Sequence, residues 1–274
     1  MAAGQTDSAV GERSSYLANL QSAARVVHTL EFLARVEGAS LDELAEELGV
    51  HKSNALRLLA TLREFDWVIM DRGRSRYSLG PRLIAIGQAA TSGQQFEQAL
   101  TIARQVRDLT GETAHISVPY GDRMLIVGRV DSTNPLKVTT DVGWEDHLHA
   151  SAVGKVFLAS LPDGELDLLL QRLDLVKLTP STITSRKGLR EDIRRTRERG
   201  YALNEEEERS GTTAIGVALG FGIGPLSLIS LSASGPADRF SRAAMEALAP
   251  AVLEIVRPYQ ALVSSPAPAV GEKA

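Results

Sequence analysis

The stretch that decides the fold is residues 40–80, SLDELAEELGVHKSNALRLLATLREFDWVIMDRGRSRYSLG. Ser40 and Glu43 have the spacing of a capping box, in which each side chain bonds the backbone N–H of the other residue. Apolar residues at 41, 44, 45 and 48 then repeat with the period of a helix. Gly49 stands where a left-handed residue commonly ends one. The sequence therefore predicts a helix over 41–48 that buries those four apolar residues.

A second helix is predicted to begin near Lys52, after a tight turn. Its apolar side holds residues 55, 58, 59 and 62, and its polar side holds Lys52, Ser53, Asn54 and Arg57. Two short strands are predicted at 67–70 and 77–79, and the basic tip between them carries Arg72, Arg74 and Arg76. A helix that can enter a major groove, followed by a basic hairpin, forms a winged helix-turn-helix that reads duplex DNA.

The roles expected on this DNA-reading surface follow from side-chain chemistry. Ser53 and Asn54 are predicted to contact base edges, and Arg57 suits either a guanine or a phosphate. The three arginines of the tip suit phosphates, with a solvated turn as the ordinary alternative. The net charge of −4 is no objection, because residues 50–82 carry seven basic and three acidic side chains, and the local field matters more than the total charge.

The whole chain of 274 residues is long enough for two domains. It has no cysteine, which excludes disulfides, thiolate catalysis and cysteine-ligated metals. Charged residues interrupt every apolar run before membrane-spanning length, and residues 1–7 lack the features of a secretory signal. We expect a cytoplasmic protein with no membrane partner.

Beyond the winged motif, the pattern predicts an antiparallel α+β domain. A first helix is expected at 21–35, with residues 24, 27, 30, 32 and 33 facing the core, and a linker helix opens at Pro81. Strands are expected at 113–120, 123–130, 136–140, 201–204, 212–219 and 226–234. Helices are expected at 96–109, 151–160, 163–172, 187–199 and from 239 onward, with Pro250 and Pro258 breaking or kinking the last one.

Several segments together resemble the IclR family of bacterial transcription regulators. The resemblance covers about residues 17 to 262, and it is specific because the segments occur together in this order and spacing. They are residues 52–62, 76–80, 148–155, 178–183, 200–202 with Glu206 and Glu207, and 232–236. The resemblance implies a winged helix-turn-helix over 18–80, a linker helix that dimerises over 81–95, and a GAF-like effector domain over 96–263 with a six-stranded antiparallel sheet. Tails at 1–17 and 264–274 are expected to be disordered.

The resemblance also implies partners. These are a palindromic operator in double-stranded DNA, a second copy of the chain in a dimer or tetramer, and a small effector, an organic acid or related amide. Such proteins are commonly repressors of catabolic genes. No cofactor, metal or enzymatic activity is expected.

A turn at 150–155 is the first predicted part of the effector site. His149 stands where a nucleotide-binding loop would need glycine, so the small residues instead open a helix whose free N–H groups suit an anion. Plain capping by Ser151 is the alternative. The resemblance implies that this turn receives the ligand carboxylate, through Ser151, Ala152, Val153 and Gly154.

The second predicted part is a strand whose face carries Ser230, Ser232 and Ser234, opposite residues 229, 231 and 233. A solvated sheet face is the ordinary interpretation, and the resemblance implies that Ser232 and Ser234 bond the effector. Asn204 and Ala214 complete the predicted site. They replace a family acid and a frequent cysteine, which makes the pocket less acidic and roomier and favours a larger or aromatic acid or amide.

Other patterns carry weaker chemistry. His147 and His149 are two apart beside Glu145 and Asp146, but without a third ligand we expect hydrogen bonding or pocket lining in place of a metal. The acidic run 205–208 is interpreted as a solvated turn. Residues 220–225 are interpreted as a hairpin turn, because Pro225 spoils a dinucleotide fingerprint.

Three hypotheses from different classes remain. The first is a ligand-responsive DNA-binding regulator, in which effector binding shifts the two DNA-binding domains. The second is an enzyme acting on a small acid with a DNA-binding appendage, for which no nucleophile motif is present. The third is a DNA-binding protein that needs no ligand.

Overall fold

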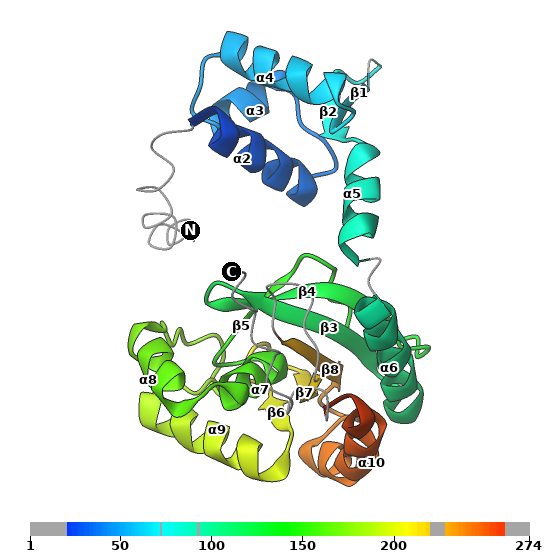
Figure 1. Cartoon of the computed structure of the whole chain (residues 1–274), viewed down its shortest axis with the longest axis vertical. Helices are drawn as coiled ribbons and strands as arrows, with labels where there is room; N and C mark the ends of the chain where they lie inside the picture. The colour runs from blue at the N-terminus through cyan, green and yellow to red at the C-terminus, as the bar shows by residue number, and fades with distance from the viewer. Residues whose placement is uncertain (1–20, 72, 92–93, 220–227, 261–274) are drawn as a thin grey trace, which may run out of the picture. The chain divides into compact units, whose positions relative to one another are not determined.

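A computed structural model describes residues 21–71, 73–91, 94–219 and 228–260 (Figure 1). The chain divides into two compact units, residues 1–92 and residues 93–274. The division falls inside the segment 81–95 that the sequence assigns to a linker. The predicted tails at 1–17 and 264–274 and the predicted turn at 220–225 lie outside the described residues.

Among its described residues, the first unit is a three-helix winged fold followed by one more helix. Its elements are α2 (Gln21–Arg35), α3 (Leu41–Glu47), α4 (Lys52–Glu64), β1 (Val68–Asp71), β2 (Arg76–Leu79) and α5 (Arg82–Thr91). The capping box is present, because Ser40 N–H donates to Glu43 Oε2 at 2.7 Å and Glu43 N–H donates to Ser40 Oγ at 3.2 Å. Gly49 has φ +60°, as a left-handed helix stop requires.

Two expectations about the first unit's core need correction. Val27 was predicted to face the core, but 51% of its surface is exposed. Thr29 lies buried on that helix instead, because its hydroxyl donates to Arg25 O at 2.7 Å and so enters the core with its polar group satisfied. Leu41 and Leu48 are half-buried, so Leu44 and Ala45 supply the buried contacts of α3.

The second unit contains the remaining described elements. They are α6 (Gln94–Thr110), β3 (Thr113–Tyr120), β4 (Arg123–Val130), β5 (Glu145–His147), α7 (Ala152–Ser160), α8 (Asp163–Arg172), α9 (Arg186–Arg199), β6 (Ala202–Glu205), β7 (Thr212–Leu219), β8 (Ile229–Pro236) and α10 (Arg242–Gln260). Six strands form one antiparallel sheet in the order β5-β4-β3-β8-β7-β6. The expected fold class is confirmed.

The predicted strand at 136–140 is wrong. That segment has no strand conformation, and β5 at 145–147 takes the sheet edge beside β4. Side chains hold the segment where a ladder would otherwise do so: Arg129 Nη1 donates to Thr140 O at 3.2 Å, and Lys137 Nζ donates to Ser132 O at 3.3 Å. The alternation of apolar and polar residues therefore predicted a strand where the structure has a loop. Hydrogen bonds from two cationic side chains hold that loop in place.

The last helix also differs from expectation. It begins at Arg242, because Arg239 lies in the preceding turn and pairs with Glu112 at 2.6 Å. It runs through Pro250 and Pro258 without ending, so of the two predicted effects of these prolines, a break or a kink, the break is wrong. A proline inside a helix costs about 3 kcal/mol. The helix also buries Ala249, Val252 and Val256 against the sheet, which offsets that cost.

Different helices cover the two faces of the sheet. One face carries Ile116, Ile215 and Leu231, which form a hydrophobic core with α6 and α10. The opposite face is covered by α7, behind which α8 and α9 build a second core (Figure 1). A Cβ atom on Gly216 would lie 2.7 Å from the backbone of Ala152. This glycine therefore lets the first turn of α7 rest directly on β7.

Candidate functional site

The exposed side of α4 is the first candidate site. His51 caps this helix, since its Nδ1 accepts from Ser53 N–H at 3.3 Å and lies 2.9 Å from Ser53 Oγ. Buried Ala55, Leu59 and Leu62 hold the other side of the helix in the core of the unit. The four predicted DNA-contacting residues of the helix are all exposed on one polar surface: Lys52, Ser53, Asn54 and Arg57.

The two cationic side chains of this surface, Lys52 and Arg57, differ in whether they form an ion pair. Lys52 Nζ lies 2.8 Å from a carboxylate oxygen of Asp42, on a neighbouring helix. The guanidinium of Arg57 forms no ion pair with any residue that the structure describes, and it is open to solvent. The helix therefore presents one paired and one unpaired cation beside two short polar side chains.

The wing arginines also separate from one another. Arg74 is largely exposed, with Asp71 at 4.0 Å. Arg76 donates from Nε and Nη2 to Gly38 O, at 3.1 and 2.5 Å, and Nη2 lies 3.2 Å from Glu43 Oε2. Arg72 lies outside the described residues. Arg76 is thus already bonded within the unit, whereas Arg74 is available to an anion.

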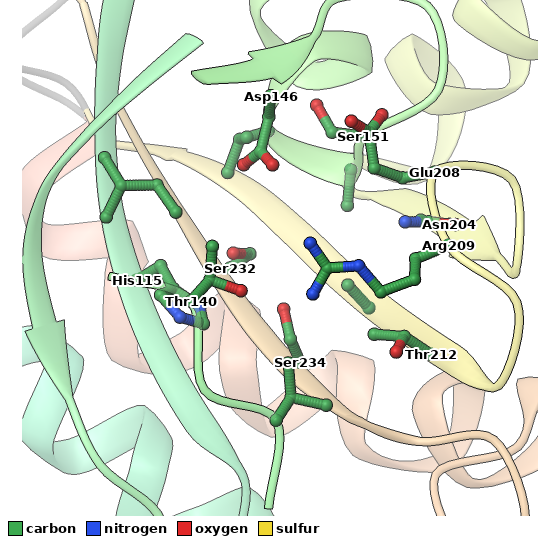
Figure 2. Close-up of a pocket in the computed structure, with 15 residues that line it drawn as sticks. His115, Thr140, Asp146, Ser151, Asn204, Glu208, Arg209, Thr212, Ser232 and Ser234 are labelled. Carbon is green, nitrogen blue, oxygen red and sulfur yellow. The ribbon is translucent and has the colours of Figure 1, made fainter. Parts of the chain in front are cut away.

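The second candidate site is a cavity in the other unit, between the sheet and the first turn of α7 (Figure 2). Its volume is about 50 Å³. Its apolar lining consists of Ile126, Val138, Ala152, Val153 and Ala214. Its polar lining consists of His115, Thr140, Asp146, Ser151, Asn204, Glu208, Arg209, Thr212, Ser232 and Ser234. Seven of the eight predicted effector residues therefore line one cavity.

Gly154 is the predicted residue that does not line it. Its N–H donates to Ser151 Oγ at 3.0 Å, which is the helix cap, and Ser151 Oγ donates to His147 O at 2.8 Å. A Cβ atom at Gly154 would lie 2.5 Å from the backbone of Leu148. Position 154 therefore requires glycine for close packing. The amides of Ala152 and Val153 belong to the first turn of α7, where backbone N–H groups have no partner within the helix.

Strand register brings the predicted strand residues together. Asn204 pairs with Ala214, and Ala214 pairs with Ser234, which places the three side by side on one face. In the next row on that face, Gly216 pairs with Ser232, and Ser232 pairs with His115. Ser230, Ser232 and Ser234 are all buried, so the solvated-face interpretation is wrong.

Asn204 presents one end of its amide to the cavity. Its Oδ1 accepts from Glu207 N–H at 2.8 Å, which leaves the Nδ2 group as a donor. An aspartate here would offer a second acceptor where asparagine offers two N–H groups. The cavity is therefore richer in donors on this side than one lined by an acid.

Sequence reasoning missed six polar residues of the lining: His115, Thr140, Asp146, Glu208, Arg209 and Thr212. The sequence did offer a signal for Arg209, because this residue directly follows the acidic run 205–208. A cation beside four acids either pairs with one of them or points to another part of the structure. His115 lies in a strand whose first six residues are all buried, a position where a polar ring needs a reason.

Burial perturbs two of these titratable groups. It raises the pKa of Asp146 to about 7, with a further contribution from the charge of Glu208, while Arg209 and a hydrogen bond from Trp144 oppose the rise. Burial also lowers the pKa of His115 to about 4, helped by the charge of Arg129. At neutral pH the His115 ring is therefore neutral.

His147 and His149 serve as hydrogen-bonding residues in the structure. His147 Nδ1 lies 2.8 Å from Glu208 Oε1, and His149 Nε2 lies 2.9 Å from Val176 O. Their rings meet edge to face at 5.6 Å. Across the described ranges, no group of three or more His, Asp or Glu side chains is arranged to hold a metal ion.

The acidic run is not the solvated turn that was predicted. Glu207 is buried and its Oε1 lies 2.6 Å from Nζ of Lys155, which is itself only 1% exposed and also lies 2.8 Å from Asp192. Glu208 is held by His147, and Glu206 accepts from Gly211 N–H at 2.7 Å. Three acids of the run are thus used to build the unit.

Among the described residues, no helix is long and apolar enough to cross a membrane.

Comparison with known proteins agrees with this geometry. The family described as "IclR helix-turn-helix domain" matches residues 22–71, and "Bacterial transcriptional regulator IclR C-terminal" matches residues 88–260. The HTH-type transcriptional regulator BhcR of Paracoccus denitrificans is 30% identical over 85% of this chain and 84% of its own length. The transcriptional repressor IclR of Escherichia coli is 28% identical over 81% and 82%.

A solved structure shares the arrangement of elements. The IclR transcriptional regulator of Alicyclobacillus acidocaldarius is 29% identical and superposes with a TM-score of 0.78, covering 89% of this chain and 99% of that one. With both family descriptions matched in order along one chain, the protein belongs to the IclR family of transcriptional regulators.

Proposed function

We propose that the protein is a ligand-responsive regulator that represses a catabolic operon. It binds a palindromic operator as a dimer or tetramer and is switched by a small organic or aromatic acid, or a related amide. The observation that carries this proposal is the pairing, in one chain, of an exposed polar helix surface in one unit with a cavity lined by polar and apolar side chains in the other. The 28% identical relative named as a repressor favours repression.

On the DNA side, the proposal assigns Ser53 and Asn54 to base edges and Arg57 to a guanine or a phosphate. Arg72, Arg74 and Arg76 remain proposed phosphate contacts, with Arg76 first needing release from Glu43. A dimer presents two copies of α4 to successive major grooves, which is why a palindromic operator is proposed.

For dimerisation, we assign α5, within the proposed linker 81–95. Ile84 and Ile86 on this helix are 66% and 41% exposed. Large apolar side chains exposed on this helix favour burial against a second copy.

On the effector side, Ser151, Ala152, Val153, Asn204, Ala214, Ser232 and Ser234 are the proposed ligand contacts. Gly154 is kept only as the residue that lets the turn pack. The cavity mixes hydroxyl, amide and charged groups with five apolar side chains, which suits a small acid or amide.

The test is operator binding followed by fluorescence anisotropy, using DNA from upstream of the protein's own gene and a scrambled duplex as control. A library of acids and amides is first screened by thermal shift, since a ligand at 100 times its Kd adds roughly 2.7 kcal/mol of stability. The proposal expects at least one stabilising compound to change operator affinity, and Ala152→Trp to abolish that change.

Each other outcome favours one alternative. Turnover of a stabilising compound would show an enzyme with a DNA-binding appendage. Operator affinity that no stabilising compound alters would show a ligand-independent DNA-binding protein. Equal affinity for operator and scrambled DNA would contradict operator recognition.

A further inference from the structure

The residue that caps α4 also contacts one of the proposed base-reading side chains. His51 lies just before the helix, and its backbone carbonyl accepts from Asn54 N–H at 2.9 Å and from Ala55 N–H at 3.2 Å. Its ring lies against the first turn, where Nδ1 accepts from Ser53 N–H at 3.3 Å and lies 2.9 Å from Ser53 Oγ. The imidazole and the Ser53 hydroxyl are therefore adjacent at the start of the helix that the proposed function places in the major groove.

The two contacts of His51 Nδ1 determine where the protons lie. A backbone N–H can only donate, so Nδ1 presents its lone pair to Ser53 N–H. In a neutral imidazole, the other ring nitrogen, Nε2, then carries the ring proton. Because Nδ1 has no proton to give, the hydroxyl of Ser53 is the donor across the distance of 2.9 Å. The hydroxyl proton of Ser53 is therefore bonded within the protein.

The lone pairs of Ser53 Oγ remain for a ligand. A serine hydroxyl has one proton and two acceptor lone pairs. In the described part of the chain, no group other than His51 hydrogen-bonds this oxygen, and the side chain is exposed. Residues at the start of a recognition helix are the ones that reach base edges. Ser53 thus offers DNA an acceptor, with its donor already used.

An acceptor distinguishes among the groups that DNA exposes in the major groove. Adenine N6 and cytosine N4 carry N–H donors there, whereas guanine and thymine present only hydrogen-bond acceptors. Phosphate oxygens are acceptors too. A freely rotating hydroxyl can bond to any of these groups, because it can donate as well as accept. A hydroxyl whose proton is held by His51 can bond only to an amino group.

We propose that His51 is a positioning residue for base recognition: by holding the hydroxyl proton of Ser53, it restricts Ser53 to the amino group of an adenine or a cytosine. This inference rests on the proposed function, because it takes α4 as the recognition helix. It adds the class of base that Ser53 reads and the residue that fixes this choice.

The first test measures the ring of His51 without DNA. Nitrogen-15 NMR of the full chain at pH 8 distinguishes a ring nitrogen that carries a proton from one that does not. The chain has five histidines, and the signals of His51 are identified by their absence from His51→Asn. We expect the proton on Nε2, and Ser53→Ala should shift the Nδ1 resonance because a hydrogen bond is lost. A proton on Nδ1, or an Nδ1 resonance that Ser53→Ala leaves unchanged, would overturn the inference.

The second test uses the operator located upstream of the protein's own gene, with affinity followed by fluorescence anisotropy. N6-methyladenine or N4-methylcytosine is placed at one position at a time, because each methyl group blocks an amino proton in the major groove while the base still pairs. Blocking one amino group in each half-site should weaken wild-type binding about 3- to 10-fold, as for one neutral hydrogen bond. Ser53→Ala should be insensitive to that methyl group. Duplexes with 7-deazapurines, which lack the N7 acceptor, should show no penalty that depends on Ser53.

Two variants of His51 separate this role from helix capping. Asparagine is a preferred capping residue, and its side-chain oxygen can accept from both the N–H and the hydroxyl of Ser53. His51→Asn should therefore keep the wild-type pattern of penalties. Glycine is also accepted at this position of a helix but has no side-chain acceptor. His51→Gly should shrink the penalty of the blocked amino group, because the freed hydroxyl can then donate to other groups.

The two tests give separate outcomes for this inference and for the proposed function. With an operator that binds, the inference is overturned if no methylated amino group gives a penalty that depends on Ser53. It is also overturned if a 7-deazapurine gives such a penalty in wild type, or if His51→Gly keeps the wild-type pattern. Equal affinity for the upstream duplex and a scrambled duplex would instead contradict the proposed function, and this inference with it.

Discussion

The two candidate sites of this protein are built in opposite ways. The proposed DNA-reading surface takes its helix residues from positions 52 to 57, all exposed on one helix. The cavity takes its lining from positions 115 to 234, on strands, loops and one helix start, and most of it is buried. A site carried by one element is visible in local sequence, whereas a site assembled by sheet register appears only when distant strands are paired.

The difference extends to energetics. Charges in water interact weakly and are screened by salt, while charges in a low-dielectric interior interact strongly and are costly to leave unpaired. Equivalent changes should therefore cost more around the cavity than on the DNA-reading surface. The following predictions break or sharpen that contrast, from the largest expected effect to the smallest.

The largest effect is expected at the buried ion pair behind the cavity. Lys155→Met should destabilise the second unit by about 3–5 kcal/mol, because it strands the buried Glu207 carboxylate. Urea unfolding of the Trp67→Phe protein, followed by Trp144 fluorescence, measures this loss. Arg190→Met breaks an exposed pair with Asp167 in the same unit and should cost less than about 1 kcal/mol. Equal losses in the two variants would abolish the contrast.

The next effect concerns the serines of β8. Ser232→Ala with Ser234→Ala removes two hydroxyls from the cavity, and each should weaken effector binding by about 1–2 kcal/mol. The ratio of operator affinities with and without effector should fall toward one. Ser230→Ala, on the same strand face but outside the cavity lining, is the control. A double variant with an unchanged ratio would place the ligand elsewhere.

On the exposed surface, Arg57→Ala should weaken operator binding by about 1–3 kcal/mol, through loss of a base or phosphate contact. Fluorescence anisotropy at fixed salt gives the value. Arg63→Ala, in the last turn of the same helix, serves as the matched control and should have a smaller effect. Wild-type affinity in the Arg57 variant would remove this residue from the interface.

The smallest effect is a pH dependence from Asp146. Its pKa is raised to about 7, so the carboxyl is neutral below that pH and negative above it. An anionic effector should therefore bind up to about tenfold more weakly at pH 8 than at pH 6, since a one-unit pKa shift corresponds to a tenfold change. Isothermal calorimetry of wild type against Asp146→Asn tests this, because the variant should show a flat profile.

The same titration affects stability, with a definite sign. The folded protein holds a proton on Asp146 that the unfolded chain has already lost near pH 4, so stability falls as the pH rises from about 4 through about 7. Stability that rises over this interval in wild type relative to Asp146→Asn would contradict the assigned pKa.

Local sequence signals predicted much of the fold. The capping box at Ser40, the period of the following helix and the hairpin at 121–122 all rest on contacts within a few residues, and all are present. The error at 136–140 arose because alternation of apolar and polar residues does not reveal side-chain hydrogen bonds to the backbone, and those of Arg129 and Lys137 hold this segment as a loop.

The cavity was predictable only in part. Ser151, Asn204 and Ser232 came from resemblance to a family, while Arg209 and His115 were missed. His115 joins the cavity because it pairs with Ser232, which lies 117 positions further along the chain, and no short-range pattern signals such a pairing. Glu207 was assigned to solvent for a similar reason, since its partner Lys155 is distant in sequence and buried with it.

The carboxylate of Glu43 has a consequence for how DNA affinity responds to salt. One oxygen, Oε2, accepts from Ser40 N–H at 2.7 Å and lies 3.2 Å from Arg76 Nη2, so a single acid both closes a helix cap and neutralises a basic residue of the wing. Lys52 is likewise paired with Asp42. Counterions are released from DNA when unpaired protein cations neutralise its phosphates. The number released should therefore be smaller than the seven basic residues of 50–82 suggest, and closer to the number of arginines, such as Arg57 and Arg74, that the fold leaves open.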